Sequence, residues 1–262
     1  MNVASVNGQQ IAYDDTGGEG PVVVLAHGYF MDRTMFAPQV AVLRDRYRVI
    51  TWDARGFGDT VYDNQPFTYW DTAGDCVALL DYLGIERAVI GGMSQGGFVS
   101  LRVALLAPER VQALILFNTQ AGTEDPDAIS LYQGMIDHWV SEGPTREVAD
   151  VVAGIILGEP GLCQTWAARW MALPKGEGAL PGRALLIRDD VTPRLGEIAA
   201  PALVVHGTAD AAIPMAKAET LAEGLPGCVG VVAIQDGSHS ANLTHPGAVN
   251  DAVLAFLDTL PE

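Results

Sequence analysis

The chain has 262 residues, of which 49% are apolar, and a formal net charge of −17. This length and apolar content allow a large buried core, arranged as one α/β domain or as two smaller ones. The acidic excess argues against a nucleic-acid partner, because phosphate binding needs clustered Lys and Arg side chains. The basic cluster at 44–48 is interrupted by Asp45, so we interpret it as a solvated loop.

Cysteine usage and hydropathy indicate the environment of the protein. Cys76, Cys163 and Cys228 are odd in number and far apart, which favours reduced thiols and fits no zinc-site spacing. No uninterrupted apolar run approaches the roughly 18 residues of a membrane span, and the first residues lack a signal-peptide pattern. We therefore expect a cytoplasmic protein without a metal, an organic cofactor or a membrane contact. The sequence carries no signal for an oligomeric state.

In chain order, the first predicted element is a hairpin. Residues 2–15 alternate in polarity and turn at Asn7-Gly8, which predicts two antiparallel strands at a sheet edge. Six nearly continuous apolar runs follow, as expected for strands covered on both faces, and they begin at Pro21, Tyr47, Arg87, Val111, Pro201 and Cys228. Helical patterns lie between them. The sequence thus predicts an α/β fold with a mostly parallel sheet of eight strands, hairpin included.

The strand pattern stops between 121 and 197. This segment has no convincing strand, and Pro and Gly separate its helical stretches, which we place at 126–143, 145–159, 161–174 and 182–198. We interpret it as a helical cap inserted between two strands of one sheet. The predicted organisation is a core formed by 1–120 and 198–262, with the cap at 121–197.

Four glycines surround Ser94 between a predicted strand and a predicted helix: Gly91, Gly92, Gly96 and Gly97. Residues 92–96 match G-x-S-x-G in the strand–turn–helix context that this motif requires. Such a turn exposes the serine hydroxyl and brings its neighbours so close that a Cβ would clash. Neither G-x-G-x-x-G nor the P-loop pattern fits, which argues against a phosphate loop. A purely structural tight turn is the alternative.

A nucleophilic serine needs a base, which is usually a histidine. His239 follows the last predicted strand in a loop, where the chain order serine, acid, histidine places the base. The remaining histidines end strands, lie on a cap helix or precede a proline: His27, His206, His138 and His245. His239 is therefore the predicted base, with His245 as the competing candidate.

The acid that orients this base is expected at the end of a strand between Ser94 and His239. Asp210 closes the predicted strand that begins at Pro201, and we assign it this role. The end of the preceding strand holds Asn118 and offers no acid. The other aspartates lie too near His239 in sequence or are expected to flank a cap helix: Asp236, Asp189 and Asp190.

Acyl transfer also needs two N–H donors for the oxyanion. The backbone N–H of Gln95, next after Ser94, is one candidate. The second is expected from the loop "HGYF", where Tyr29 or Phe30 supplies it.

Five motifs in order, "HGYF", "WDARGFGDT", "GGMSQGG", "HGTAD" and "GSHSANLTHP", resemble the α/β-hydrolase superfamily over essentially the whole chain. Within this superfamily, its motifs most resemble those of the bacterial group that contains 3-oxoadipate enol-lactonases, cofactor-free haloperoxidases and small carboxylesterases. The resemblance implies an α/β-hydrolase fold with a helical cap after the sixth strand. It also implies Ser94 as nucleophile, His239 as general base and then acid, and Asp210 as its orienter. In "DARGFGDT", Asp53 and Arg55 are expected to fix a turn.

Large apolar side chains of the cap are candidates for the substrate pocket. Trp166 and Trp170 are four residues apart and share a helix face. With Trp139 and with Phe30 at the mouth, they are predicted to bind an uncharged, moderately apolar substrate. The alternative is that they attach the cap to the core. Gln95 stands where many relatives have Met or Leu, and its side chain could reach the pocket.

The leading hypothesis is a serine hydrolase that cleaves a small carboxylic ester or lactone through an acyl-enzyme on Ser94. A perhydrolase or a C–C bond hydrolase would use the same residues, and a thioesterase is a further alternative. Epoxide hydrolases and haloalkane dehalogenases are disfavoured, since related enzymes carry Asp at the position of Ser94. A ligand receptor or a cofactor-free oxygenase on the same fold is a hypothesis of another class.

Overall fold

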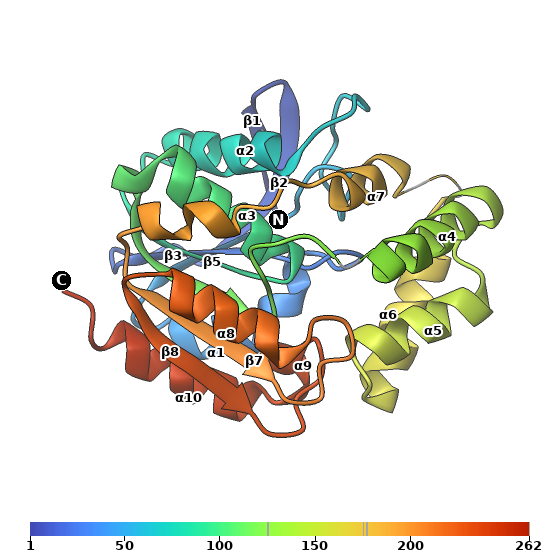
Figure 1. Cartoon of the computed structure of the whole chain (residues 1–262). Coiled ribbons are helices and arrows are strands. Elements are labelled where there is room, and N and C mark those ends of the chain that lie inside the picture. The colour runs from blue at the N-terminus through green and yellow to red at the C-terminus, as the bar shows by residue number, and fades with distance from the viewer. Residues whose placement is uncertain (125, 175, 177, 262) are drawn as a thin grey trace.

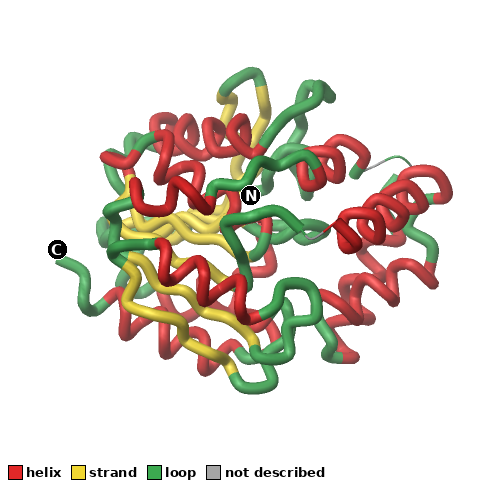
Figure 2. Tube along the Cα trace, in the orientation of Figure 1, coloured by secondary structure: helices red, strands yellow, loops and turns green. Residues whose placement is uncertain are grey.

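The computed structural model describes residues 1–124, 126–174, 176 and 178–261. One eight-stranded sheet crosses the molecule in the order β1-β2-β4-β3-β5-β6-β7-β8 (Figure 1, Figure 2). The predicted mostly parallel sheet is confirmed, because all neighbouring pairs from β4 to β8 are parallel. The strands are β1 (Asn2–Val6), β2 (Gln9–Asp15), β3 (Val22–Ala26), β4 (Arg48–Trp52), β5 (Ala88–Met93), β6 (Val111–Phe117), β7 (Ala202–Gly207) and β8 (Cys228–Ile234).

The first two strands form the predicted hairpin at the sheet edge. β1 pairs with β2 and β2 with β4, both antiparallel. Asn7 and Gly8 between them have φ of 49° and 77°. Two successive positive φ values define the turn whose twist matches paired strands, and Asn-Gly is its preferred dipeptide.

Helices cover both faces of the sheet. Helices α1 (Ala37–Leu43) and α10 (Pro246–Leu257) pack against each other. Helices α2 (Tyr69–Tyr82) and α3 (Gln95–Leu106) also pack against each other, and they lie above the sheet in Figure 1. Every residue of β5 and of β7 is buried, as expected for parallel strands covered on both sides. The core also contains η1 (Arg33–Phe36), η2 (Pro108–Arg110), α8 (Met215–Gly224) and α9 (Ala241–Thr244).

The cap follows β6 and consists of helices α4 (Pro126–Glu142), α5 (Arg146–Ile156), α6 (Pro160–Met171) and α7 (Ala179–Leu186). It stands to one side of the sheet in Figure 1, with α4 against α7 and α5 against α6. The helical cap after the sixth strand is thereby confirmed.

The fourth predicted cap helix, 182–198, was wrong as a single element. α7 ends at Leu186, and a separate 3₁₀-helix, η3, spans Thr192–Glu197. Pro193 is incompatible with one continuous helix over 182–198, since a proline inside a helix removes a hydrogen bond and clashes with the preceding turn. The Asp190 carboxylate accepts the Thr192 N–H at 2.8 Å and stabilises the intervening turn.

Within the described ranges, no helix is both long and apolar enough to cross a membrane. Over the same residues, His, Cys, Asp and Glu side chains form no group of three that could hold a metal ion. Cys76, Cys163 and Cys228 are free thiols.

Candidate active site

Ser94 occupies a strained turn between β5 and α3. Its φ of 51° and ψ of −112° lie outside the regions that L-residues prefer. The turn depends on glycine, because a Cβ on Gly96 would lie 1.8 Å from the Ala26 carbonyl oxygen. One on Gly92 would lie 2.3 Å from the carbonyl carbon of Gly96. The close approach expected from the motif is therefore present.

Two residues that the sequence analysis passed over hold this region. The Thr119 hydroxyl donates to the Ser94 carbonyl at 2.7 Å, and the Asn118 amide donates to the Asp210 carboxylate at 2.9 Å. Both residues are buried and directly follow β6, whose neighbours β5 and β7 lead to Ser94 and Asp210. Their position at the end of a strand between two candidate strands was the signal that could have identified them.

Asp210 and His239 form a buried pair. Nδ1 of His239 lies 2.9 and 3.0 Å from the two carboxylate oxygens of Asp210. Oδ1 of Asp210 also accepts the backbone N–H groups of Ala212 at 2.8 Å and Ile213 at 2.9 Å. This arrangement fixes the carboxylate and leaves the opposite nitrogen of the imidazole, Nε2, to act on a second group.

The surroundings of Asp210 favour its charged form. Burial raises the pKa of its carboxyl, but His239, the Asn118 amide and the Ile213 N–H lower it more, so the pKa lies below its ordinary value. His206 is also near, with Nε2 at 2.8 Å from the Ile213 carbonyl oxygen and 3.3 Å from the Asp210 carboxylate. Burial lowers the pKa of His206, which favours the neutral ring there.

Ser94 and His239 line one small cavity of about 70 Å³ between core and cap. Most of its other lining side chains are apolar, and the cap contributes several of them: Met135, Val152, Ile155, Ile156 and Leu185. Phe30 and Tyr29 line it from the core, so Phe30 lies where the sequence analysis expected a pocket residue.

The three cap tryptophans lie elsewhere. Trp139, Trp166 and Trp170 line a second, larger cavity of about 390 Å³, which shares Phe30 with the first. Trp170 Nε1 donates to the Phe30 carbonyl at 2.5 Å, and the Trp139 ring lies 4.3 Å from the Phe30 ring between centroids. The structure therefore groups these side chains around the "HGYF" loop and not beside Ser94.

The loop that carries Tyr29 and Phe30 turns sharply at Phe30, whose φ is 64°. Gln95, the other expected oxyanion donor, follows Ser94 at the N-terminus of α3, where the first N–H groups have no partner within the helix. The Gln95 side chain does not line the cavity, contrary to the expectation that it could reach it. It is buried in the core, where it accepts a hydrogen bond from the Tyr69 hydroxyl at 3.1 Å.

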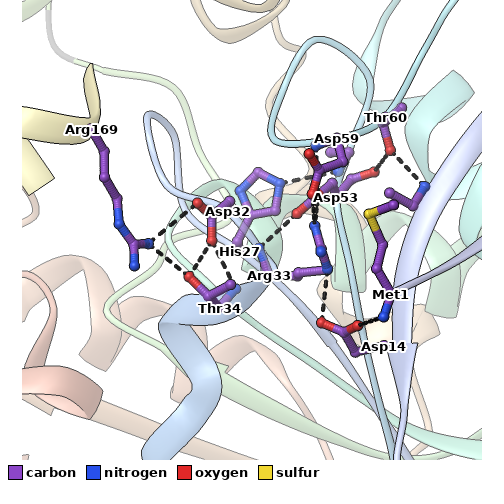
Figure 3. Close-up of polar contacts among 12 residues, drawn as sticks. Met1, Asp14, His27, Asp32, Arg33, Thr34, Asp53, Asp59, Thr60 and Arg169 are labelled. Carbon is purple, nitrogen blue, oxygen red and sulfur yellow. Dashed lines mark hydrogen bonds and ion pairs between the residues drawn. The ribbon is translucent and has the colours of Figure 1, made fainter. Parts of the chain in front are cut away.

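A network of charges supports this loop from behind (Figure 3). The fully buried Asp53 accepts the backbone N–H of Arg33 at 2.7 Å and its guanidinium at 2.5 Å. The same Arg33 reaches Asp14 and Asp59, each at 2.8 Å. The ring of His27, which precedes the loop, accepts the Ala54 N–H at 3.0 Å.

Figure 3 also shows Arg169 of α6 reaching toward Thr34 and Asp32 of the core. The guanidinium lies 2.9 Å from the Thr34 hydroxyl and 3.6 Å from the Asp32 carboxylate. Arg55, the other residue expected to fix a turn, pairs with the buried Asp75 of α2. These ion pairs join the loops after β3 and β4 to each other, to the cap and to α2.

Comparison with known proteins agrees with this architecture. A family model for the α/β-hydrolase fold matches residues 21–160, and one for TAP-like proteins matches 162–261. The 3-oxoadipate enol-lactonase 2 of Acinetobacter baylyi is 28% identical over 243 residues, covering 90% of this chain and 88% of that protein.

Solved structures agree over nearly the whole length. The enol-lactonase from Burkholderia xenovorans has a TM-score of 0.89 at 30% identity, covering 98% of this chain and 99% of that one. A thermophilic esterase from Thermogutta terrifontis has a TM-score of 0.89 at 28% identity, covering 98% and 97%. The chain thus belongs to the α/β-hydrolase family, as its motifs indicated.

Proposed function

We propose that the protein is a serine hydrolase of small carboxylic esters or lactones. The observation that carries the proposal is the meeting of a strained serine turn and a buried Asp210–His239 pair at one cavity. Ser94 is the nucleophile, His239 the general base and then the general acid, and Asp210 the residue that orients the imidazole. The esterase and enol-lactonase among the similar structures support this class of reaction.

The first step is activation of Ser94. A charged Asp210 accepts a hydrogen bond from Nδ1–H of His239, which keeps the proton on Nδ1. Nε2 therefore carries no proton and can take the one on the Ser94 hydroxyl. The serine oxygen then attacks the carbonyl carbon of the substrate. The imidazolium that forms is stabilised by the Asp210 carboxylate, which stays ionised.

The tetrahedral intermediate carries a negative oxygen. We assign its stabilisation to the backbone N–H groups of Tyr29 and Gln95, with the positive end of the α3 dipole beneath the turn. The intermediate collapses as His239 returns its proton to the leaving alkoxide, which departs as the alcohol. His239 then takes a proton from a water molecule, which attacks the acyl-enzyme and forms a second tetrahedral intermediate. This intermediate collapses as His239 gives that proton to the Ser94 oxygen, which releases the acid and restores the Ser94 hydroxyl.

Cavity size and composition limit the substrate. A volume of about 70 Å³ is far below the roughly 300–1,000 Å³ of pockets that hold drug-sized ligands. The lining offers mainly apolar contact from Phe98, Val152 and Ile156. These features favour a short, uncharged acyl group at Ser94.

The test is covalent labelling with a fluorophosphonate probe, mapped by mass spectrometry. We expect an adduct on Ser94 in the wild type, none in Ser94→Ala, and at least a hundredfold slower labelling in His239→Ala, since the base is lost. His138→Ala serves as the matched control, because His138 is exposed on α4 and should label as the wild type does.

The same proteins are then assayed on 4-nitrophenyl acetate, 4-nitrophenyl butyrate and γ-butyrolactone. Turnover that disappears in Ser94→Ala supports the proposal. A folded wild type that neither labels nor hydrolyses these compounds contradicts it and favours a receptor or an oxygenase.

A further inference from the structure

We propose that Glu124 is a specificity-determining residue, which selects acyl groups that carry a hydrogen-bond donor and rejects those that end in a carboxylate. The inference rests on the proposed function, because it assigns the substrate class of the same cavity. Glu124 is the acidic residue among the described side chains that line the cavity with Ser94 and His239.

The Glu124 carboxylate is held from behind by two partners. Oε1 accepts from the Arg188 guanidinium at 2.7 Å, and Oε2 accepts from the Gln120 amide at 3.1 Å. An ionised carboxylate offers about four lone-pair sites, so these two bonds leave acceptor capacity for a ligand. Gln120 and Arg188 themselves do not line the cavity.

The Arg188 guanidinium is held by hydrogen bonds within the protein. Its guanidinium also donates to the Gly122 carbonyl at 3.2 Å and to the Leu185 carbonyl at 2.9 Å, and it lies 4.4 Å from the centre of the Phe98 ring. Its side chain is 2% exposed and that of Glu124 is 11% exposed. A ligand in the cavity therefore meets the carboxylate and not the guanidinium.

A buried ion pair rarely adds net stability over apolar residues of the same volume, because both ions lose their hydration. Placed at the wall of a substrate cavity, the pair instead supplies a fixed acceptor in an apolar surrounding. The guanidinium, which donates to Oε1 at 2.7 Å, fixes the orientation of that acceptor. Such an arrangement suits recognition of a donor more than it suits packing.

Tyr132 of α4 adds a hydroxyl to the same wall. Burial, and then the charges of Glu124 and Asp210, raise the pKa of its phenol to about 12, so it stays protonated at neutral pH. Tyr132 lines the cavity together with Glu124 and His239. A substrate hydroxyl that donates to Glu124 keeps lone pairs with which it can accept from a phenol such as Tyr132, whereas an N–H can only donate.

The ligand class follows from charge and hydrogen bonding. An acyl chain with a hydroxyl or amide N–H near its end can donate to Glu124, whereas a methyl end leaves the remaining acceptor sites of the carboxylate without a donor. An acyl chain that ends in a carboxylate places two negative charges together in a poorly hydrated cavity. We therefore expect hydroxyl-bearing esters to be the best substrates and half-esters of diacids the worst.

The experiment compares methyl esters of straight-chain acids with about four to six carbons. The far end of the acyl chain carries a methyl, a hydroxyl or a carboxylate group, and we call the three compounds the methyl-ended, hydroxyl-ended and carboxylate-ended esters. For the wild type at neutral pH, we expect kcat/KM for the best hydroxyl ester to exceed its methyl counterpart about tenfold. The kcat/KM for the carboxylate-ended ester should lie at least tenfold below that for the methyl-ended ester. These ratios need no variant, so they test the inference even where a substitution harms folding.

Glu124→Gln keeps the shape and removes the charge. In this variant we expect kcat/KM for the hydroxyl-ended ester to lie within about twofold of that for the methyl-ended ester. The kcat/KM for the carboxylate-ended ester should rise about tenfold relative to that for the methyl-ended ester. Glu124→Asp keeps the charge but withdraws it by one methylene, so its optimum should move to a hydroxyl ester one carbon longer. Glu147→Gln, on the exposed face of α5, is the matched control and should retain all wild-type ratios.

The outcomes separate the two proposals. If the wild type shows equal kcat/KM for the methyl-ended, hydroxyl-ended and carboxylate-ended esters, the role of Glu124 is overturned, but the proposed hydrolase activity stands. Unchanged ratios in a folded Glu124→Gln protein do the same. No hydrolysis of any ester, together with no labelling of Ser94, removes the proposed function and this inference with it.

Discussion

The edge of the core and the cap hold their side chains in different ways. At the core, backbone geometry fixes the candidate catalytic groups: Ser94 lies in a strained turn, and two successive backbone N–H groups hold Asp210. In the cap, long-range side-chain contacts do this work, such as Trp170 to Phe30 and Arg188 to Glu124. The backbone arrangement suits precise chemistry, and the side-chain arrangement suits change of substrate.

This contrast separates two kinds of effect. Substitutions at the core edge should lower kcat for every substrate, because they alter the groups that we propose act on the reacting atoms. Substitutions in the cap should reorder substrates, because they reshape the wall of the cavity. A cap substitution that lowers kcat for every substrate would show that the two regions act together.

The largest effect is expected for Asp210→Asn. An amide at this position can donate to Nδ1 of His239 and favour the wrong tautomer, so kcat for 4-nitrophenyl butyrate should fall roughly 10³- to 10⁴-fold. Asp236→Asn is the control, because Asp236 is exposed just before His239 and has a φ of 57°, which asparagine tolerates. A loss of less than about tenfold in a folded Asp210→Asn protein would contradict the role of Asp210.

A smaller effect is expected for Asn118→Ala. The substitution removes the amide that donates to Asp210 at 2.9 Å and to the Ser238 carbonyl at 3.1 Å. We expect kcat to fall roughly tenfold with little change in KM, because Asn118 positions the acid and does not line the cavity. An unchanged kcat, or a change confined to KM, would show that Asn118 is not a positioning residue.

The core-edge residues were predictable because local backbone geometry restricts their identity. Gly96 must lack a Cβ to approach Ala26, and that demand is written in the sequence as G-x-S-x-G. The order of Ser94, Asp210 and His239 along the chain follows from strand order in this fold. The hairpin at Asn7-Gly8 was predictable for the same reason, since its turn requires two positive φ values.

The cap and the supporting residues depend on contacts between distant segments. Nothing near Trp170 in sequence indicates that its indole N–H meets the Phe30 carbonyl, 140 residues away. An asparagine at the end of β6 offers no acid, so the sequence motif does not indicate that the Asn118 amide donates to Asp210. Helix periodicity likewise could not show that the chain after Leu186 leaves the helix so that Arg188 can reach Glu124.

Trp170→Phe tests whether the cap contributes to chemistry. The phenyl ring keeps most of the apolar contact but loses the hydrogen bond to the loop that carries Tyr29, so kcat should fall about three- to tenfold for all esters. Trp166→Phe, four residues earlier on α6, is the matched control with an expected change below about twofold. If Trp170→Phe changes substrate preference but not kcat, the cap affects only which substrates bind and does not contribute to the chemical step.

The smallest effect concerns the link between the cap's end and α3. The half-exposed Asp189 pairs with the buried Arg102 at 2.6 Å. Partial burial raises the pKa of the Asp189 carboxyl, but hydrogen bonds and charge from Arg102, with Trp70, lower it below its ordinary value. A lowered pKa means that the stabilisation is complete above the ordinary value and is lost as pH falls through the folded-state value.

Asp189→Asn should therefore lower the free energy of unfolding by less than about 1 kcal/mol at pH 7. The difference from wild type should shrink as pH falls below the ordinary aspartate pKa toward the lower folded-state value. Urea unfolding at pH 7, 5 and 3 measures this. Asp150→Asn breaks an ion pair within α5 whose members are both exposed, and it should change nothing measurable. A larger loss for Asp150→Asn than for Asp189→Asn would mean that the cap is stabilised by its own surface and not by its attachment to the core.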